Sequence, residues 1–386
     1  MQIINETSHL IDFCNKAKKT SYIAIDTEFL REKTYFAKLC LIQIAFRGDG
    51  KNDAAIIDVL SKNICLDPIY ELFKNKKIIK VFHAARQDVE IFFLSKGLIP
   101  QPFFDTQLAA MVCGFGDQVG YETIVRQLTS INIDKSSRFT DWSKRPLTEK
   151  QINYAISDVT HLRTVYEKLL EMLDKNKRIS WVKDELKILL EPKTYVNNPD
   201  EAWKKIKVKN NSPSFLTHLK FLACFREKQA QKKNIPRNRI FSDDVLTEMA
   251  RLKPNCIEDL KKSRFLNKEL KSGFIADGII NAIKYSKKAL ETDNGVISSS
   301  NIKKINNSLT DLLKVLLKYK SEEWGVAQRL IASNSEIIEI ATEENPNVQA
   351  LKGWRKEVFG DEALKLKAGL VALSVKELEI KLIKLD

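Results

Sequence analysis

An apolar run that ends in two acids, Tyr22-Ile-Ala-Ile-Asp-Thr-Glu28, constrains this chain more than any other stretch. Its β-branched and aromatic residues predict a buried strand. Alternate residues of a strand point to the same side, so Asp26 and Glu28 face one place. Two carboxylates that lie side by side repel each other unless a cation lies between them. Mg²⁺ or Mn²⁺ is the cation that such oxygen ligands usually bind. An ordinary acidic turn would give the same D-x-E pattern, so other parts of the chain must decide.

Strand and helix patterns alternate along the chain after this run. Strands are predicted at 39–46, 54–58, 77–82 and 102–105, and helices at 67–73, at 106–113 and directly after residue 82. Val89, Phe92 and Phe93 are expected on the inward face of the helix that follows residue 82. This alternation after an initial meander predicts an α/β layer with a mixed sheet.

The clearest helix begins near Thr148 and runs to about Leu173. Thr148 and Gln151 form a capping-box pattern at its start. Tyr154 and Asp158 are four residues apart, so they lie one turn apart at the edge of the apolar stripe. An exposed helix face would show the same Y-x-x-x-D pair, so the pair alone identifies no site. The residues of the stripe recur at helical spacing: Ile152, Ala155, Ile156, Val159, Leu162, Tyr166, Leu169, Leu170 and Leu173.

The character of the sequence changes after Pro192, where linker-like and purely helical patterns replace the strands. Further helices are expected within 213–290 and at 309–317, 327–331, 335–341 and 348–358, with a low-order join at 294–300. We therefore predict a first domain at 1–190, a linker at 191–211, a small all-α bundle at 212–292, a linker at 293–302 and a second small all-α bundle at 303–386.

Composition narrows the classes to which the chain can belong. Its 386 residues suffice for two or three domains, and 44% hydrophobic with 30% charged residues is typical of soluble globular proteins. No apolar run approaches the roughly 20 residues that cross a bilayer, and the N-terminus lacks the pattern of a secretion signal. Six scattered cysteines without a C-x-x-C pair indicate reduced thiols and a cytoplasmic location. The net charge of +14 favours a polyanionic partner such as nucleic acid, although a genome-wide lysine bias would add to the same excess.

Two further acids belong beside the opening pair. Asp88 lies just inside the helix after a central strand, and Asp158 lies on the capped helix. Ligands of α/β sheets gather at strand ends and adjoining helix starts. Four carboxylates there would hold two divalent cations about 3.5–4 Å apart, which suits phosphodiester hydrolysis by the two-metal route. Tyr154 is placed to hydrogen-bond and aim the attacking water.

Four motifs together resemble the bacterial ribonuclease D family, a branch of the DEDD 3′–5′ exonucleases. They are Asp26-Thr-Glu-Phe-Leu-Arg-Glu32, Phe82-His-Ala-Ala-Arg-Gln-Asp88, Asp141-Trp-Ser-Lys-Arg-Pro-Leu147 and Tyr154-Ala-Ile-Ser-Asp158. The resemblance implies a ribonuclease H-like exonuclease domain with a mixed sheet, followed by helicase-and-RNase-D C-terminal (HRDC) domains. Phe225-Arg-Glu and Pro236-Arg-Asn-Arg-Ile240, followed by Asp244 and Leu246, resemble one HRDC domain, and 350–359 resembles the tail of a second, more divergent one.

The resemblance also implies roles for individual residues. Asp26, Glu28, Asp88 and Asp158 would ligate two divalent metal ions, Mg²⁺ or Mn²⁺. Tyr154 marks the tyrosine branch, because the position where the histidine branch carries its histidine is Asn153 here. Phe29 resembles a residue that contacts the terminal nucleotide, with core packing as the alternative. His83 lies near the site, where a packing role is the alternative to nucleic-acid contact.

A basic segment lies outside the first domain, in the linker and the start of the first bundle. Residues 204–239 hold eleven Lys and Arg and a single acid, Glu227. Phosphate contacts supply much of the affinity for nucleic acid and carry no sequence information. A solvated lysine-rich face is the alternative. We predict that Lys232, Lys233, Arg237 and Arg239 hold the body of a folded RNA while its 3′ end reaches the metals.

The leading hypothesis is a metal-dependent 3′–5′ exoribonuclease that releases 5′-mononucleotides. The resemblance implies 3′-extended precursors of tRNA and other stable RNAs as substrates. Two alternatives stay open: a DNA-directed editing exonuclease, and a catalytically inactive nucleic-acid-binding scaffold. An enzyme with its own RNA-binding appendages needs no partner subunit, so a monomer is expected.

Overall fold

The computed structural model describes residues 2–48, 52–134, 136–138, 140–208, 212–292 and 307–385. Its described residues group into two compact units that do not follow chain order. Unit 1 takes in Met1–Glu28, Leu41–Glu191 and Ile302–Asp386, and unit 2 takes in Phe29–Cys40 and Pro192–Asn301. The predicted join at 294–300 lies outside the described residues, and the predicted domain boundaries stay predictions.

A six-stranded mixed sheet forms the centre of the N-terminal part of unit 1, in the order β1-β4-β3-β2-β5-β6. The strands are β1 (Gln2–Ile4), β2 (Tyr22–Leu30), β3 (Lys38–Phe46), β4 (Ala54–Ile57), β5 (Ile79–Phe82) and β6 (Phe103–Asp105). β1 pairs with β4 in parallel, β3 with β4 antiparallel, and β5 lies parallel to both β2 and β6. The mixed α/β layer predicted from the alternating pattern is confirmed, and β1 is an addition to it.

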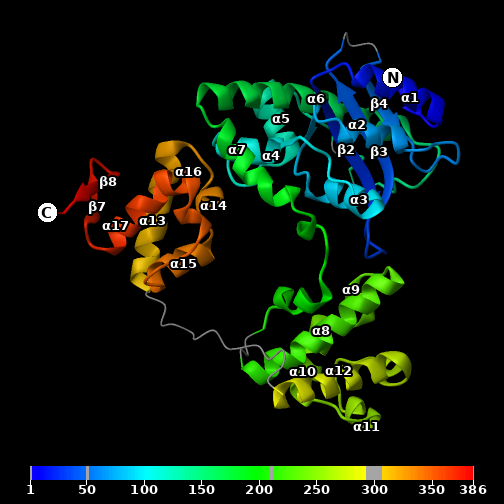
Figure 1. Cartoon of the computed structure of the whole chain (residues 1–386), viewed down its shortest axis with the longest axis vertical. Coiled ribbons are helices and arrows are strands. Elements are labelled where there is room, and N and C mark those ends of the chain that lie inside the picture. Colours follow the sequence, from blue (N-terminus) through cyan, green and yellow to red (C-terminus); the bar gives the residue numbers. More distant parts are fainter. Residues whose placement is uncertain are drawn as a thin grey trace. The chain divides into compact units, whose positions relative to one another are not determined.

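Helices α1 to α7 lie around this sheet in the described part of the chain (Figure 1). The long helix α6 contacts β4 and β5 and also packs against α4 and α5, whereas α1 contacts β1 and α2. α1, α5 and α7 were not predicted. The helices are α1 (Thr7–Ala17), α2 (Asp67–Lys74), α3 (Arg86–Lys96), α4 (Thr106–Val112), α5 (Tyr121–Thr129), α6 (Glu149–Lys175) and α7 (Ile179–Leu186).

Helix α6 begins where its capping box predicted. The Thr148 hydroxyl accepts the backbone N–H of Gln151, and the Gln151 side chain accepts the backbone N–H of Thr148. Ala155, Val159 and Leu169 of the predicted stripe are fully buried. Burial of this stripe, at about 25 cal/mol per Å² of apolar surface, fixes the rotation of α6 and thereby aims its polar residues. On α3, Val89 and Phe92 are buried as expected, while Phe93 is only half-buried.

Unit 2 is a helical bundle in which α8 packs against α10 and α12. Its core includes the fully buried Leu219, Leu222, Leu246 and Ile279. The predicted linker at 191–211 contains two short 3₁₀ helices, Pro192–Thr194 and Pro199–Lys205. The helices of the bundle are α8 (Pro213–Lys233), α9 (Arg237–Ile240), α10 (Asp243–Leu252), α11 (Ile257–Lys261) and α12 (Gly273–Glu291), with a 3₁₀ turn at Lys268–Lys271.

The C-terminal part of unit 1 is helical and ends in a β-hairpin that was not predicted. Its strands β7 (Val371–Lys376) and β8 (Glu379–Lys384) pair antiparallel, and the two turn residues Glu377 and Leu378 have positive φ. The all-α bundle expected here therefore carries a two-stranded sheet in addition. Its helices are α13 (Asn307–Trp324), α14 (Gln328–Ile331), α15 (Asn334–Thr342), α16 (Gly353–Arg355) and α17 (Asp361–Lys367), with a π-helical turn at Lys356–Gly360.

Two further expectations concern membranes and cysteines. Among the helices of the described residues, none combines the length and the apolar character that crossing a membrane requires. All six cysteines are free thiols, of which Cys14 and Cys40 are buried.

Candidate active site

Three acids from two distant parts of the sequence meet at the end of β2. Asp26 and Glu28 lie on β2, and Asp158 lies in the third turn of α6. One carboxylate oxygen of each lies within 4.8 Å of those of the other two. Alternation along β2 turns Asp26 and Glu28 to the same side, and the packing of α6 on the sheet brings Asp158 to them. Asp158 is buried, whereas Asp26 and Glu28 are half-buried.

Asp88 lies beside this group, in the first turn of α3, and is buried. Its carboxylate accepts a hydrogen bond from the hydroxyl of Thr27. Thr27 stands between Asp26 and Glu28 on β2, so it points to the other side of the strand and fixes Asp88 from there. Asp88 and Asp26 are close enough that the charge of Asp26 raises the pKa of Asp88. The structure thus brings three predicted acids into one group and places the fourth next to it.

Burial and mutual repulsion oppose the ionisation of these acids. Burial raises the pKa of Asp26 to about 6. Burial, reinforced by the charges of Asp26, Asp158 and Asp88, raises the pKa of Glu28 to about 10. The pKa of Asp158 is also raised, mainly by burial and then by Asp26. The protein positions anionic groups where ionisation is unfavourable, which is the electrostatic signature of a site that needs a cation.

Tyr154 lies one turn before Asp158 and is half-buried against Trp142, with the ring centroids 6.0 Å apart. It lies close enough to the Asp158 carboxylate to lower the pKa of that acid, against the larger effect of burial. Burial and then the charge of Asp158 raise the pKa of Tyr154, so it stays a neutral donor. One carboxylate oxygen of Asp158, Oδ1, is buried and has no hydrogen-bond partner among the residues that the structure describes. A buried carboxylate oxygen without a donor fits coordination by a hard cation.

Two residues that position this site were missed in the sequence. The Tyr121 hydroxyl on α5 donates to the backbone carbonyl of Asp158. Asp105 accepts the backbone N–H groups of Ala84, Ala85 and Gln107, and so ties the turn before α3 to the start of α4. An acid directly before an apolar helix is an N-cap signal, so Asp105 was recognisable. No sequence signal connects Tyr121 with Asp158.

His83 lies in the turn before α3, close to Tyr121, with the ring centroids 5.4 Å apart. Its Nε2 is 3.1 Å from the carbonyl oxygen of Val119, and its Nδ1 is 3.0 Å from the hydroxyl of Thr106. Burial lowers the pKa of His83, so the ring is neutral, and its Nε2–H donates to the Val119 carbonyl. Because protein atoms occupy both nitrogens, the geometry favours the packing role over nucleic-acid contact.

The remaining predicted contacts with nucleic acid lie in unit 2. Phe29 is half-buried, Lys232, Lys233 and Arg239 are exposed, and Arg237 is half-buried. The charge count of residues 204–239 overstated the basic surface. Arg226 is 2% exposed and forms an ion pair with Asp243.

The comparisons with known proteins cover nearly the whole chain. The profile of the 3′–5′ exonuclease family matches residues 1–174, and that of the HRDC domain matches residues 216–280. A ribonuclease D of Jannaschia sp. is 48% identical over 99% of both chains, and one of Granulibacter bethesdensis is 43% identical over 99% of this chain and 96% of its own length.

A solved structure agrees with these relatives. The crystal structure of Escherichia coli RNase D, described as an exoribonuclease involved in structured RNA processing, has a TM-score of 0.81. It is 26% identical and covers 95% of this chain and 98% of its own. These findings confirm the resemblance carried by the four motifs. With curated relatives at 48% and 43% identity over nearly the whole chain, and with matches to a 3′–5′ exonuclease profile and then an HRDC profile along it, the chain belongs to the ribonuclease D family of 3′–5′ exoribonucleases.

Proposed function

We propose that this ribonuclease trims the 3′ ends of structured RNAs, tRNA precursors with 3′ extensions among them, and releases 5′-mononucleotides. The observation that carries the proposal is the group of carboxylate oxygens of Asp26, Glu28 and Asp158, which lie within 4.8 Å of one another. Such a group suits the binding of divalent cations, and it is formed by the residues that the family resemblance implies as ligands. A monomer in the cytoplasm is part of the proposal.

Asp26, Glu28, Asp158 and Asp88 are the residues proposed to hold two Mg²⁺ or Mn²⁺ ions. When bound, these ions lower the pKa of the attacking water and stabilise the charge on the leaving 3′ oxygen. Asp158 offers Oδ1, which no described residue contacts by a hydrogen bond, and Asp88 is held in place by Thr27. The raised pKa values mean that the site must lose protons as it takes up cations.

Tyr154 is the residue proposed to orient the attacking water. Its hydroxyl is neutral and lies beside Asp158, one helical turn away on α6. Trp142 is 2% exposed and packs against the Tyr154 ring, which limits the ring to few orientations. A hydroxyl held in this way orients a nucleophile without the entropy cost of a mobile side chain. Phe29 is proposed to contact the terminal nucleotide.

Replacing Asp158 with Asn tests the metal site. We expect Asp158→Asn to lower the rate of 3′ trimming by about 10²-fold or more, on the scale of removing one electrostatic stabiliser from an active site. Isothermal titration calorimetry should show weaker Mg²⁺ binding by the same variant. Asp174→Asn is the matched control, because Asp174 is exposed near the end of the same helix. Equal activity of the two variants would show that the site is misassigned.

The substrate class needs a separate assay. A tRNA carrying a 3′ extension, an unstructured RNA and a single-stranded DNA of equal length are 5′-labelled and incubated with Mg²⁺ or with EDTA. We expect trimming of both RNAs, faster for the extended tRNA, little cleavage of DNA, and no cleavage in EDTA. Faster cleavage of DNA, or cleavage that persists in EDTA, would contradict the proposal.

A further inference from the structure

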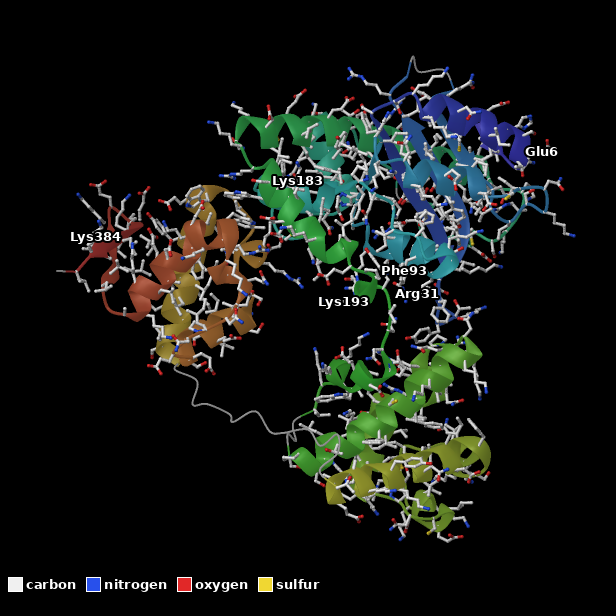
Figure 2. The ribbon with its side chains drawn as sticks, viewed as in Figure 1. Glu6, Arg31, Phe93, Lys183, Lys193 and Lys384 are labelled. Carbon is white, nitrogen blue, oxygen red and sulfur yellow. The ribbon has the colours of Figure 1, made fainter. Side chains whose placement is uncertain are left out.

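The segment that directly follows the catalytic strand belongs to the helical unit. Glu28 is assigned to unit 1, but Phe29–Cys40, which includes Arg31 (labelled in Figure 2), is assigned to unit 2 together with Pro192–Asn301. The chain therefore passes into unit 2 immediately after Glu28 and returns at Leu41. This segment includes the end of β2 and the start of β3, so unit 2 is joined to the catalytic strand through it as well as through the connection at Glu191–Pro192.

Tyr35 anchors this segment in the helical bundle. Its side chain is 9% exposed and forms part of the core of unit 2, and Phe36 packs against the same core. The Tyr35 hydroxyl donates to Glu227, which is 2% exposed on α8. Gln231 donates from Nε2 to the Tyr35 hydroxyl at 3.3 Å. Breaking the hydrogen bond between this buried hydroxyl and this buried carboxylate would leave the O–H donor and the carboxylate acceptor without a partner, which is costly, so the anchor is strong.

Asn234 holds the backbone of the same segment. Its Oδ1 accepts the N–H of Tyr35 at 3.1 Å and the N–H of Phe36 at 3.0 Å. Asn234 is the C-cap residue of α8 and has φ 49° and ψ 46°, a left-handed conformation that Asn tolerates better than most residues. It directly follows Lys232 and Lys233, two of the residues proposed to bind RNA. The end of α8 therefore carries both the anchor and the basic side chains.

The length of the chain sets how tightly the two parts are coupled. Tyr35 is seven residues after Glu28 in the sequence. Seven residues span at most about 25 Å when fully extended, so the covalent connection between the two units is short here. A short connection of this kind raises the effective concentration of an RNA 3′ end at the carboxylates once unit 2 holds the RNA body.

We propose that Tyr35 and Asn234 are positioning residues that tether the RNA-holding helical unit to the catalytic strand, so that a structured RNA bound by the helices presents its 3′ end to the carboxylates. This inference rests on the proposed RNA binding by unit 2. The tether acts on substrates that contact both units. It does not act on a short oligoribonucleotide that reaches only the carboxylates.

The test replaces Asn234 with Gly. Glycine keeps the left-handed backbone of the helix cap and removes only the side-chain acceptor. Asn234→Asp is the conservative variant, because it retains an oxygen in the same place. Asn198→Gly is the matched control, since Asn198 lies in the same unit and its side chain instead accepts the N–H of Asp200. Each protein is assayed on a hairpin RNA with a single-stranded 3′ tail and on a short unstructured oligoribonucleotide.

We expect Asn234→Gly to lower kcat/KM on the hairpin RNA by about tenfold, because a misplaced substrate loses much of its rate. Its activity on the short oligoribonucleotide should stay unchanged. Asn234→Asp should recover the hairpin activity, and Asn198→Gly should match the wild type. Equal losses on both substrates, or no loss on either, would overturn the tether.

Limited trypsin digestion gives a readout independent of activity. Lys33 is exposed within the tethered segment. We expect cleavage after Lys33 to be faster in Asn234→Gly than in Asn234→Asp or Asn198→Gly. Release of the segment without any loss on the hairpin RNA would overturn only the tether. Failure of the wild-type protein to trim any RNA would instead overturn the proposed function.

Discussion

At the scale of single residues, the acids at the end of β2 lie where their ionised forms are unfavourable unless a cation is bound. The pKa of Asp26 is raised from 3.8 to about 6 and that of Glu28 from 4.5 to about 10. When folding raises the pKa of a group, the group stabilises the folded state fully at any pH below its pKa in the unfolded state. This stabilisation is lost as the pH rises through its pKa in the folded state. Without cations, Asp26 therefore costs stability from about pH 4 upward, with the loss complete a little above pH 6, and Glu28 adds to the cost up to about pH 10.

This sign predicts that Mg²⁺ stabilises the protein more at pH 8 than at pH 5. Cations compete with protons for the same oxygens, so they gain affinity as the carboxylates ionise. At a free Mg²⁺ concentration of about 100 times Kd, the expected stabilisation is about 2.7 kcal/mol. The measurement is Tm in Mg²⁺ minus Tm in EDTA at each pH, with Asp158→Asn as the comparison. A difference that is the same at both pH values would rule out cation binding at these acids.

At the scale of elements, the position of α6 decides whether the site exists. β2 supplies two acids by alternation, but Asp158 arrives only because the apolar stripe of α6 packs on the sheet. α5 adds a second constraint, since the Tyr121 hydroxyl donates to the carbonyl of Asp158. Trp142, from the loop before α6, holds the ring of Tyr154. The site is thus aligned by helix packing and two aromatic contacts.

Tyr121→Phe tests the contribution of α5. The substitution removes one hydrogen bond, so we expect a loss of about 1 kcal/mol in the free energy of unfolding. Because the hydroxyl orients a residue proposed to bind metal, turnover should fall by about tenfold as well. Tyr22→Phe is the control, because the Tyr22 hydroxyl donates to Glu167 farther along α6 at 2.7 Å. Turnover that falls equally in both variants would mean that the α5 contact has no special role.

At the scale of the whole molecule, the C-terminal part of the chain packs onto the exonuclease fold within unit 1. Trp354 stacks on Trp181 of α7 with ring centroids 4.4 Å apart and an angle of 9° between the planes. Glu185 of α7 accepts from Arg355 at 2.5 Å and from the Trp354 ring N–H at 3.2 Å. Trp354 and Arg355 lie in the part of the sequence that resembles a second HRDC domain, an identity that stays a prediction. The contacts make this part an integral piece of unit 1.

Arg355→Met tests that attachment. Glu185 has a side chain 9% exposed, so loss of its cationic partner leaves a buried charge. We expect a destabilisation of about 3 kcal/mol, at the lower end for breaking a buried ion pair. Urea unfolding followed by tryptophan fluorescence measures it, because Trp181 and Trp354 lie at the interface. The double variant Glu185→Gln with Arg355→Met should recover part of the loss. No change in the single variant would contradict a structural role for the pair.

The basic residues at the end of α8 belong to the same scale, because they are proposed to bind the body of the RNA. Changing Lys232, Lys233, Arg237 and Arg239 to Ala should weaken the binding of tRNA-sized RNA and reduce the slope of log K against log salt by about 3, as counterion release predicts for four phosphate contacts. Filter binding at several salt concentrations measures both. Changing Lys16, Lys18, Lys19 and Lys62 to Ala removes the same charge from unit 1 as a control. Equal effects of the two sets would mean that the binding surface is not at α8.

The sequence was informative where a local pattern has a single physical cause. The strand with its two acids, the capping box at Thr148 and the stripe of α6 were all predicted and are present. β1, α1, α5 and α7 were missed. The terminal hairpin was also missed, because a short strand is stabilised only by its pairing with another strand, which the local pattern does not show. The eleven basic residues between 204 and 239 suggested a larger basic surface than the structure has, because Arg226 is buried in the bundle and forms an ion pair with Asp243.

The sequence by itself determined the chemistry of this protein, because residue types and their spacing along one strand and one helix do not depend on the rest of the fold. The tertiary structure decided which groups from distant parts of the sequence lie close together. It brought Asp158 to Asp26 and Glu28, set Tyr121 against the backbone of α6, and placed Phe29–Cys40 in the helical unit. The reason is that such long-range contacts arise from the burial of apolar surface between elements, and that burial is a property of the assembled layers rather than of any stretch of sequence.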